Sequence, residues 1–158
     1  MKNRVRENRQ FYEGVTISEK FGTFAIFKEW ASTQIGANNE GWHIDKDILV
    51  PGNKVYSPDL CVFVPVQLNM MTPTAKAIRG TLPIGVSREK SNRATYTARC
   101  SIDGKNVKFC GFKDVQSAFN KYKEIKEANI KRLAEEYKDR IDPRVYEALI
   151  NKQVSITD

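Results

Sequence analysis

Cysteine and histidine are scarce in this 158-residue sequence, which has three cysteines (Cys61, Cys100 and Cys110) and one histidine, His43. None of them stands in a CxxC or HxxxH spacing. The sequence therefore lacks both the ligand pairs of a zinc site and the cysteine framework of a disulfide-bonded domain. We expect reduced thiols that pack in or beside the hydrophobic core.

Long apolar runs are also absent from the sequence. No stretch approaches the roughly 20 residues that a membrane span requires, and no apolar segment typical of a signal peptide follows the basic start of the chain. Hydrophobic residues nevertheless make up 41% of the chain, which is enough to bury a core without disulfides. The sequence therefore predicts a cytoplasmic protein that is folded over most of its length and has no membrane partner.

The positive charge is unevenly distributed along the sequence. The formal net charge is +7, and residues 76–113 alone hold nine Lys and Arg against two acids. The other segments cancel, with +3 over residues 1–28, −3 over residues 29–75 and zero over residues 114–158. Such a basic block is typical of proteins that bind polyanions. The alternative is a basic surface that only keeps the protein soluble.

The first half of the sequence predicts a helix followed by a ββα outline. Ser18 is a suitable N-cap, and apolar residues at helical spacing follow it to about Gln34. Two β-rich runs, at residues 41–50 and 60–64, flank a turn-forming Pro-Gly-Asn segment. A short helix or turn is expected to open near Asn69.

The second half contains a strong β-hairpin signal. Asp103 and Gly104 separate two β-rich runs, which is the composition of a two-residue type I′ turn. The turn sets the register and predicts one mostly apolar face and one polar, basic face. The predicted cross-strand partners are Ile102 with Lys105, Cys100 with Val107, Ala98 with Phe109, Arg99 with Lys108, and Tyr96 with Gly111. The polar face carries Thr95, Thr97, Arg99 and Ser101 opposite Asn106, Lys108 and Cys110.

Further elements flank this hairpin. A preceding strand is expected at residues 84–88. Asp114 can cap a helix whose apolar stripe runs to Tyr137 and covers the apolar face of the hairpin. An Asp-Pro pair at residues 142–143 starts a last short helix through about Ile150, and the tail after it is expected to be frayed.

Glycines and aromatic residues recur at fixed spacings around the hairpin, in the motifs Arg79-Gly80, Gly85-Val86-Ser87, Tyr96-Thr97-Ala98, Gly104-Lys105, Phe109-Cys110-Gly111-Phe112 and Ala118-Phe119 with Tyr122. This pattern resembles the AP2-type DNA-binding domain found at the C-terminal end of many phage HNH-family proteins, and it covers about 40 residues. The resemblance implies that the outer face of a three-stranded sheet meets duplex DNA. Each implied contact has the alternative of being a solvated strand residue. The implied contacts are Arg88, Lys90, Arg93, Arg99 and Lys108, with the Thr95 and Thr97 hydroxyls as further candidates.

The first half carries a second set of motifs, in Trp42-His43-Ile44-Asp45-Lys46-Asp47-Ile48-Leu49, Gly52-Asn53-Lys54, Tyr56-Ser57-Pro58 and Asn69. This set resembles the ββα-metal region of HNH nucleases, as phage proteins carry it. The resemblance implies Asp45 as the metal-ligating acid and Asn69 as the ligand on the helix. It places Asn53 or Asp59 at the loop position that orients the general base.

The position of the general base holds Lys46 in place of histidine. A protonated lysine cannot accept a proton from water, and the neighbouring negative charges of Asp45 and Asp47 are expected to favour the protonated form. His43 lies on the opposite face of the strand and does not replace the base. We therefore expect no efficient nuclease activity and no cofactor, whereas an active site would need a divalent metal such as Mg²⁺. Alternatively, this acidic and basic run is a salt-bridged strand and turn that holds the loop 51–59.

Together these patterns predict an α+β protein in one compact unit with two ββα-like modules. A degenerate HNH-like module spans residues 10–72, an AP2-like module with a three-stranded sheet on a helix spans residues 78–140, and residues 141–158 form a C-terminal helix and tail. The predicted function is that of a phage or prophage protein that binds duplex DNA in the bacterial cytoplasm. The alternatives are a metal-dependent HNH endonuclease and a small phage protein that binds a host protein, and RNA is an alternative nucleic-acid partner.

Overall fold

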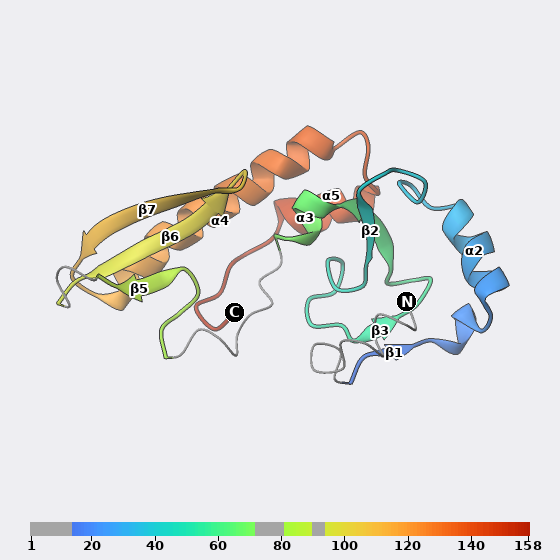
Figure 1. The fold of residues 1–158 in the computed structure, drawn as a ribbon, viewed down its shortest axis with the longest axis horizontal. Coiled ribbons are helices and arrows are strands. Elements are labelled where there is room, and N and C mark those ends of the chain that lie inside the picture. The colour runs from blue at the N-terminus through green and yellow to red at the C-terminus, as the bar shows by residue number, and fades with distance from the viewer. Residues whose placement is uncertain (1–13, 72–80, 90–93) are drawn as a thin grey trace. The chain divides into compact units, whose positions relative to one another are not determined.

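The protein has an α+β fold, which confirms the predicted fold class (Figure 1). The structure is a computed structural model that describes residues 14–71, 81–89 and 94–158. In these ranges no helix is both long enough and apolar enough to span a membrane.

The chain divides into two compact units. The first consists of Met1–Asn69 with Tyr137–Ala148, and the second of Met70–Glu136 with Leu149–Asp158. Each unit therefore takes a segment from the C-terminal part of the chain.

Two short sheets form the strands of the first unit. Strand β1 (Thr16–Ile17) pairs in parallel with β3 (Val55–Tyr56). Strand β2 (Trp42–Asp45) pairs antiparallel with β4 (Val62–Pro65), and the one-turn helix α3 (Val66–Asn69) follows directly. The order of β2, β4 and α3 is that of the predicted ββα outline.

Glycine divides the predicted N-terminal helix into two pieces. The continuous helix predicted over residues 18–34 is wrong, because a 3-10 turn η2 (Glu19–Phe21) precedes a separate helix α2 (Phe24–Ser32). Gly22 between them has a φ of 26°, which lies outside the helical region. The hydroxyl of Thr23 caps α2 by accepting a backbone N–H of its first turn at 3.4 Å.

Aromatic residues and a thiol form the core of the first unit. Phe21, Tyr56 and Cys61 are buried together, and Phe27 and Trp30 from α2 pack against them. The Phe21 ring centre lies 4.8 Å from that of Trp30 and 5.3 Å from that of Phe27. Burial raises the pKa of the Cys61 thiol to about 11, so this thiol is protonated at neutral pH.

The predicted placement of the thiols is confirmed for two cysteines. Cys61 and Cys100 are both buried and free of disulfides. The prediction is wrong for Cys110, whose side chain is exposed on an outer strand of the second unit's sheet.

A three-stranded antiparallel sheet and a long helix form the second unit (Figure 1). The central strand is β6 (Tyr96–Ile102), flanked by β5 (Val86–Arg88) and β7 (Lys105–Phe112). The helix α4 (Val115–Tyr137), nearly all of which belongs to this unit, packs against the sheet through Ala118, Phe119 and Tyr122.

Gly85 allows the start of β5 to approach α4 closely. Its φ is 72°, and a Cβ atom at this position would lie 2.1 Å from the ring of Tyr122. Both facts require glycine. The Gly85 carbonyl also accepts the Arg99 N–H at 2.7 Å, which ties this contact to the central strand.

The hairpin register follows the predicted turn along most of its length. Asp103 and Gly104 have φ values of 49° and 75°, and a type I′ turn requires two positive φ angles. The observed pairs are Ile102 with Lys105, Ser101 with Asn106, Cys100 with Val107, Arg99 with Lys108, and Ala98 with Phe109.

The register changes at the far end of the hairpin. The predicted pairing of Tyr96 with Gly111 is wrong, because Tyr96 pairs with Phe112. A β-bulge adds one residue to β7 between Phe109 and Phe112. Gly111 has a φ of 87°, and glycine is the residue that adopts this conformation in a bulge without strain.

The predicted starts of the two C-terminal helices are confirmed, whereas the prediction for the tail is not. Asp114 Oδ1 accepts the Ser117 N–H at 2.7 Å and caps α4, and the last helix α5 (Pro143–Ile150) starts at the predicted proline. The predicted frayed tail is wrong. Val154 is 2% exposed, and its N–H donates to Glu127 Oε1 on α4 at 2.8 Å.

Candidate nucleic-acid interface

Four polar side chains project from the hairpin on the face that points away from α4. Along β6, Ala98 is buried whereas Arg99 and Ser101 are exposed, as the alternation of a strand requires. On β7 the exposed Lys108 lies opposite Arg99, and the exposed Asn106 lies opposite Ser101. We call these four residues the outer face.

The two cations of the outer face have no anionic partner among the residues that the structure describes. Arg99 and Lys108 face each other directly across β6 and β7. Neither side chain makes an ion pair or a hydrogen bond within the part of the chain that the structure describes. Like charges in a directly opposite pair destabilise a sheet slightly, although salt screens exposed charges. The pair is therefore open to an anion from outside the protein.

Two buried hydroxyls lie beside the outer face. Thr97 is two residues from Arg99 on the same side of β6, but it is 0% exposed. Ser87 on β5 is its cross-strand partner, and neither hydroxyl has a hydrogen-bond partner among the described residues. Thr97, one of the implied DNA contacts, therefore does not offer its hydroxyl to a ligand in this conformation.

The other implied contacts that the structure describes, Arg88 and Thr95, do not belong to the outer face. Arg88 pairs with Tyr96, and its guanidinium lies 5.1 Å from the centre of that ring, on the opposite side of the sheet from Arg99. The Thr95 hydroxyl donates to Glu89 Oε2 at 2.9 Å. The implied contacts Lys90 and Arg93 lie outside the described residues.

The resemblance did not select Ser101 and Asn106 as contact residues. The hairpin register places both on the polar face, each two residues from Arg99 or Lys108. A hydroxyl and a carboxamide in these places give the outer face hydrogen-bond donors and acceptors next to its two cations. The sequence signal that identifies Ser101 and Asn106 is the turn at Asp103 and Gly104, because this turn sets the hairpin register.

Asp45, the implied metal-ligating acid, is a buried turn residue. It is 6% exposed, and its Oδ1 accepts the N–H groups of Asp47 at 2.8 Å and Ile48 at 2.7 Å. Burial, and to a smaller extent the neighbouring Asp47 charge, together raise the pKa of Asp45 to about 6. The carboxylate therefore shapes the loop that follows β2.

Lys46 and Asn53 hold the same loop closed. Lys46 Nζ donates to the Asn53 carbonyl at 2.8 Å and lies 3.3 Å from Asp47 Oδ2. Asn53 Nδ2 donates to the carbonyls of Lys46 at 2.6 Å and Val55 at 2.9 Å, and its Oδ1 accepts the Val55 N–H at 3.0 Å. These contacts are those of a salt-bridged turn, which was the structural alternative for this run.

The remaining HNH-like positions lie apart from Asp45. Asp59 Oδ2 pairs with Lys20 Nζ at 2.6 Å on the surface. Asn69 ends α3, which begins at the strand end paired with Trp42, whereas Asp45 lies at the other end of β2. No group of three or more His, Cys, Asp or Glu side chains within the described ranges is placed to hold a metal ion.

Comparison with known proteins gives no family assignment. No protein-family model matches the chain, and no curated protein and no solved structure matches it. The two family resemblances remain predictions.

Proposed function

We propose that this protein binds duplex DNA through the outer face and has no efficient nuclease activity. The observation that carries the proposal is the exposed pair of Arg99 and Lys108, which face each other with no anionic partner among the described residues. A polyanion would relieve the repulsion within this pair and supply the missing counter-charges.

The distribution of charge supports the same surface. Residues 76–113, which contain β5, β6 and β7, carry a net charge equal to that of the whole chain. The strands themselves carry four of the nine cations of this segment, Arg88, Arg99, Lys105 and Lys108, and no acid, so DNA binding through the sheet would depend steeply on salt.

The shape and chemistry of the outer face fit the major groove. A narrow β-ribbon can enter this groove of B-DNA, where arginine reads guanine and lysine contacts phosphates. Arg99 lies on the central strand and Lys108 on the outer strand beside it. Ser101 and Asn106 add hydrogen-bonding groups suited to base edges or phosphates.

The contacts of Lys46 in the loop after β2 support the proposal that the protein lacks efficient nuclease activity. The Lys46 ammonium donates to a backbone carbonyl and pairs with Asp47, and therefore offers no lone pair to water. Nicking of supercoiled plasmid with Mg²⁺ that disappears in the Asp45→Ala, Asn69→Ala double variant would contradict this part of the proposal.

Duplex titrations of two arginine variants test the surface. Arg99→Ala should cost about 1–3 kcal/mol, mainly on the preferred sequence, if Arg99 reads a base. Arg88→Ala is the matched control, because it removes the same side chain from the same sheet on the opposite side. Two results would contradict binding through the outer face. One is an equal loss of duplex affinity in both variants, and the other is an unchanged duplex affinity in both.

A further inference from the structure

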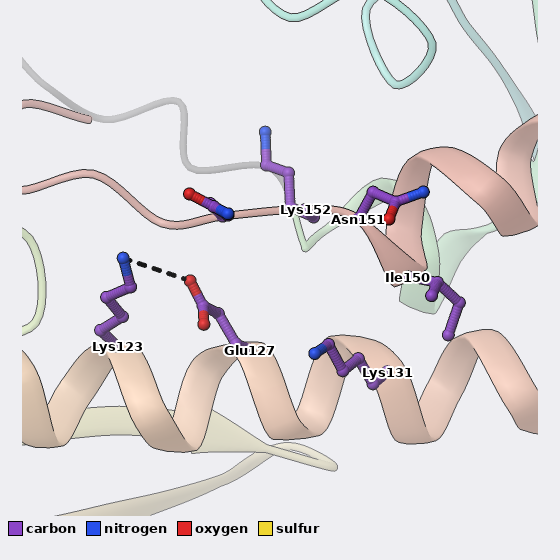
Figure 2. Close-up of a pocket in the computed structure, with 7 residues that line it drawn as sticks. Lys123, Glu127, Lys131, Ile150, Asn151 and Lys152 are labelled. Carbon is purple, nitrogen blue, oxygen red and sulfur yellow. Dashed lines mark ion pairs between the residues drawn. The ribbon is translucent and has the colours of Figure 1, made fainter.

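A polar pocket lies between α4 and the C-terminal segment of the second unit (Figure 2). Its volume is about 330 Å³. Figure 2 shows strands of the sheet on one side of α4 and the C-terminal segment on the other, so the pocket is separate from the outer face. Its polar lining comes from Lys123, Glu127 and Lys131 on α4 and from Asn151, Lys152 and Gln153 on the segment.

Packing of the C-terminal segment builds the wall of the pocket. Val154 is buried, and its N–H donates to Glu127 Oε1 at 2.8 Å. Lys123, Glu127 and Lys131 follow one another at four-residue spacing, so they form one row along α4. The segment therefore lies over a row of charged residues and is anchored at one of them.

The pocket carries a positive charge that its own acid does not cancel. Glu127 Oε1 lies 3.7 Å from Lys123 Nζ and also accepts the Val154 N–H. Lys131 and Lys152 make no ion pair within the part of the chain that the structure describes. The lining therefore has three ammonium groups against one carboxylate, and the carboxylate is already engaged.

We propose that this pocket binds a small phosphate-bearing molecule. Lys131 on α4 would supply charge-assisted hydrogen bonds to phosphate oxygens. The Lys152 side chain extends away from α4 in Figure 2, and it would turn toward the bound phosphate to add a second ammonium group. The carboxamide of Gln153 adds N–H donors. Several phosphate oxygens on one ligand would use these donors together, which favours a polyphosphate over a single carboxylate.

Titration of the full chain with inorganic triphosphate tests the site, with backbone amide shifts of residues 150–154 as the readout. The Lys131→Gln, Lys152→Gln double variant should bind triphosphate at least about tenfold more weakly. Glu127→Gln removes the repelling charge but keeps a carbonyl oxygen for the Val154 N–H. It should bind triphosphate several-fold more tightly.

The control is the Arg99→Gln, Lys108→Gln double variant, which loses the same charge from the outer face. It should keep the triphosphate affinity of the wild type even if it loses DNA, so this site and the proposed function fail separately. Equal weakening in both double variants would show diffuse attraction and overturn the site. A further outcome would also overturn the proposed phosphate site. If the wild type does not bind triphosphate and the Lys131→Gln, Lys152→Gln variant loses duplex binding, the pocket contacts a nucleic-acid backbone instead.

Discussion

The loop after β2 and the outer face of the sheet both concentrate charged and polar side chains, but they use them in opposite ways. In the loop, the side chains of Asp45, Lys46 and Asn53 all bond to nearby backbone groups. On the outer face, Arg99 and Lys108 make no such bonds with the described residues.

This difference separates a structural role from a binding role. A polar group that is satisfied within its own loop is needed for the loop's conformation and has little capacity left for a ligand. Two opposed cations without partners contribute nothing favourable to the sheet. Under the function proposed above, a partner outside the chain accounts for their placement.

The outer face exists only when the sheet is folded. Gly85 is the position at which we expect a single substitution to destabilise the sheet most. Gly85→Ala places a Cβ 2.1 Å from the Tyr122 ring at a φ of 72°. Its cost should be roughly 3 kcal/mol or more in the free energy of unfolding, measured with urea. Gly104→Ala is the control, because its φ is 75° but no atom lies within 4 Å of the added Cβ. If both variants lose the same stability, the contact with Tyr122 is not what requires glycine.

The loop should show a smaller effect on stability and none on DNA. Asn53→Ala removes three hydrogen bonds, with Lys46 and twice with Val55. It should destabilise the protein by roughly 2 kcal/mol, because three partly buried backbone groups lose their partners. Duplex affinity measured at a temperature where the variant is folded should be unchanged. A large loss of affinity would make the first unit the DNA-binding region.

Ionisation of Asp45 should give the next smaller effect. Its pKa in the folded protein is raised to about 6 from 3.8. The folded state therefore holds its proton more tightly than the unfolded state, and the stability from this group is lost as pH rises from about 4 through 6. Wild-type protein should gain roughly 1 kcal/mol between pH 7 and pH 5 from this group.

Asp45→Asn tests that assignment. The carboxamide oxygen can still accept the N–H groups of Asp47 and Ile48 but cannot ionise. The variant should lose this part of the pH dependence in urea unfolding at pH 5 and pH 7. A variant that keeps the full dependence would place the titrating group elsewhere.

Local sequence signals predicted the parts of the fold that local chemistry determines. The turn residues Asp103 and Gly104 predicted the hairpin register through Ala98 and Phe109, and an Asp-Pro pair predicted the start of α5. Gly22 is a sequence signal for the helix break before α2, since glycine destabilises a helix.

The features of the fold and of the candidate site that the sequence did not predict depend on contacts between residues distant in the sequence. The docking of Val154 on Glu127 joins residues 27 positions apart and left no periodic pattern. The side on which Arg88 projects was fixed by its pairing with Tyr96, which the sequence did not predict. At the candidate site, the Arg99 and Lys108 pair was predicted from the hairpin, whereas the burial of Thr97 was not.

The salt dependence of duplex DNA binding by two lysine variants tests the central claim most directly. Lys108 and Lys105 lie on the same strand and are both exposed, but only Lys108 belongs to the outer face. If the outer face meets the phosphates, Lys108→Ala should reduce the slope of log affinity against log salt by about one and weaken binding to all sequences, whereas Lys105→Ala should leave the slope unchanged. Equal slopes for the wild type and Lys108→Ala, or a reduction only in Lys105→Ala, would contradict binding through this face.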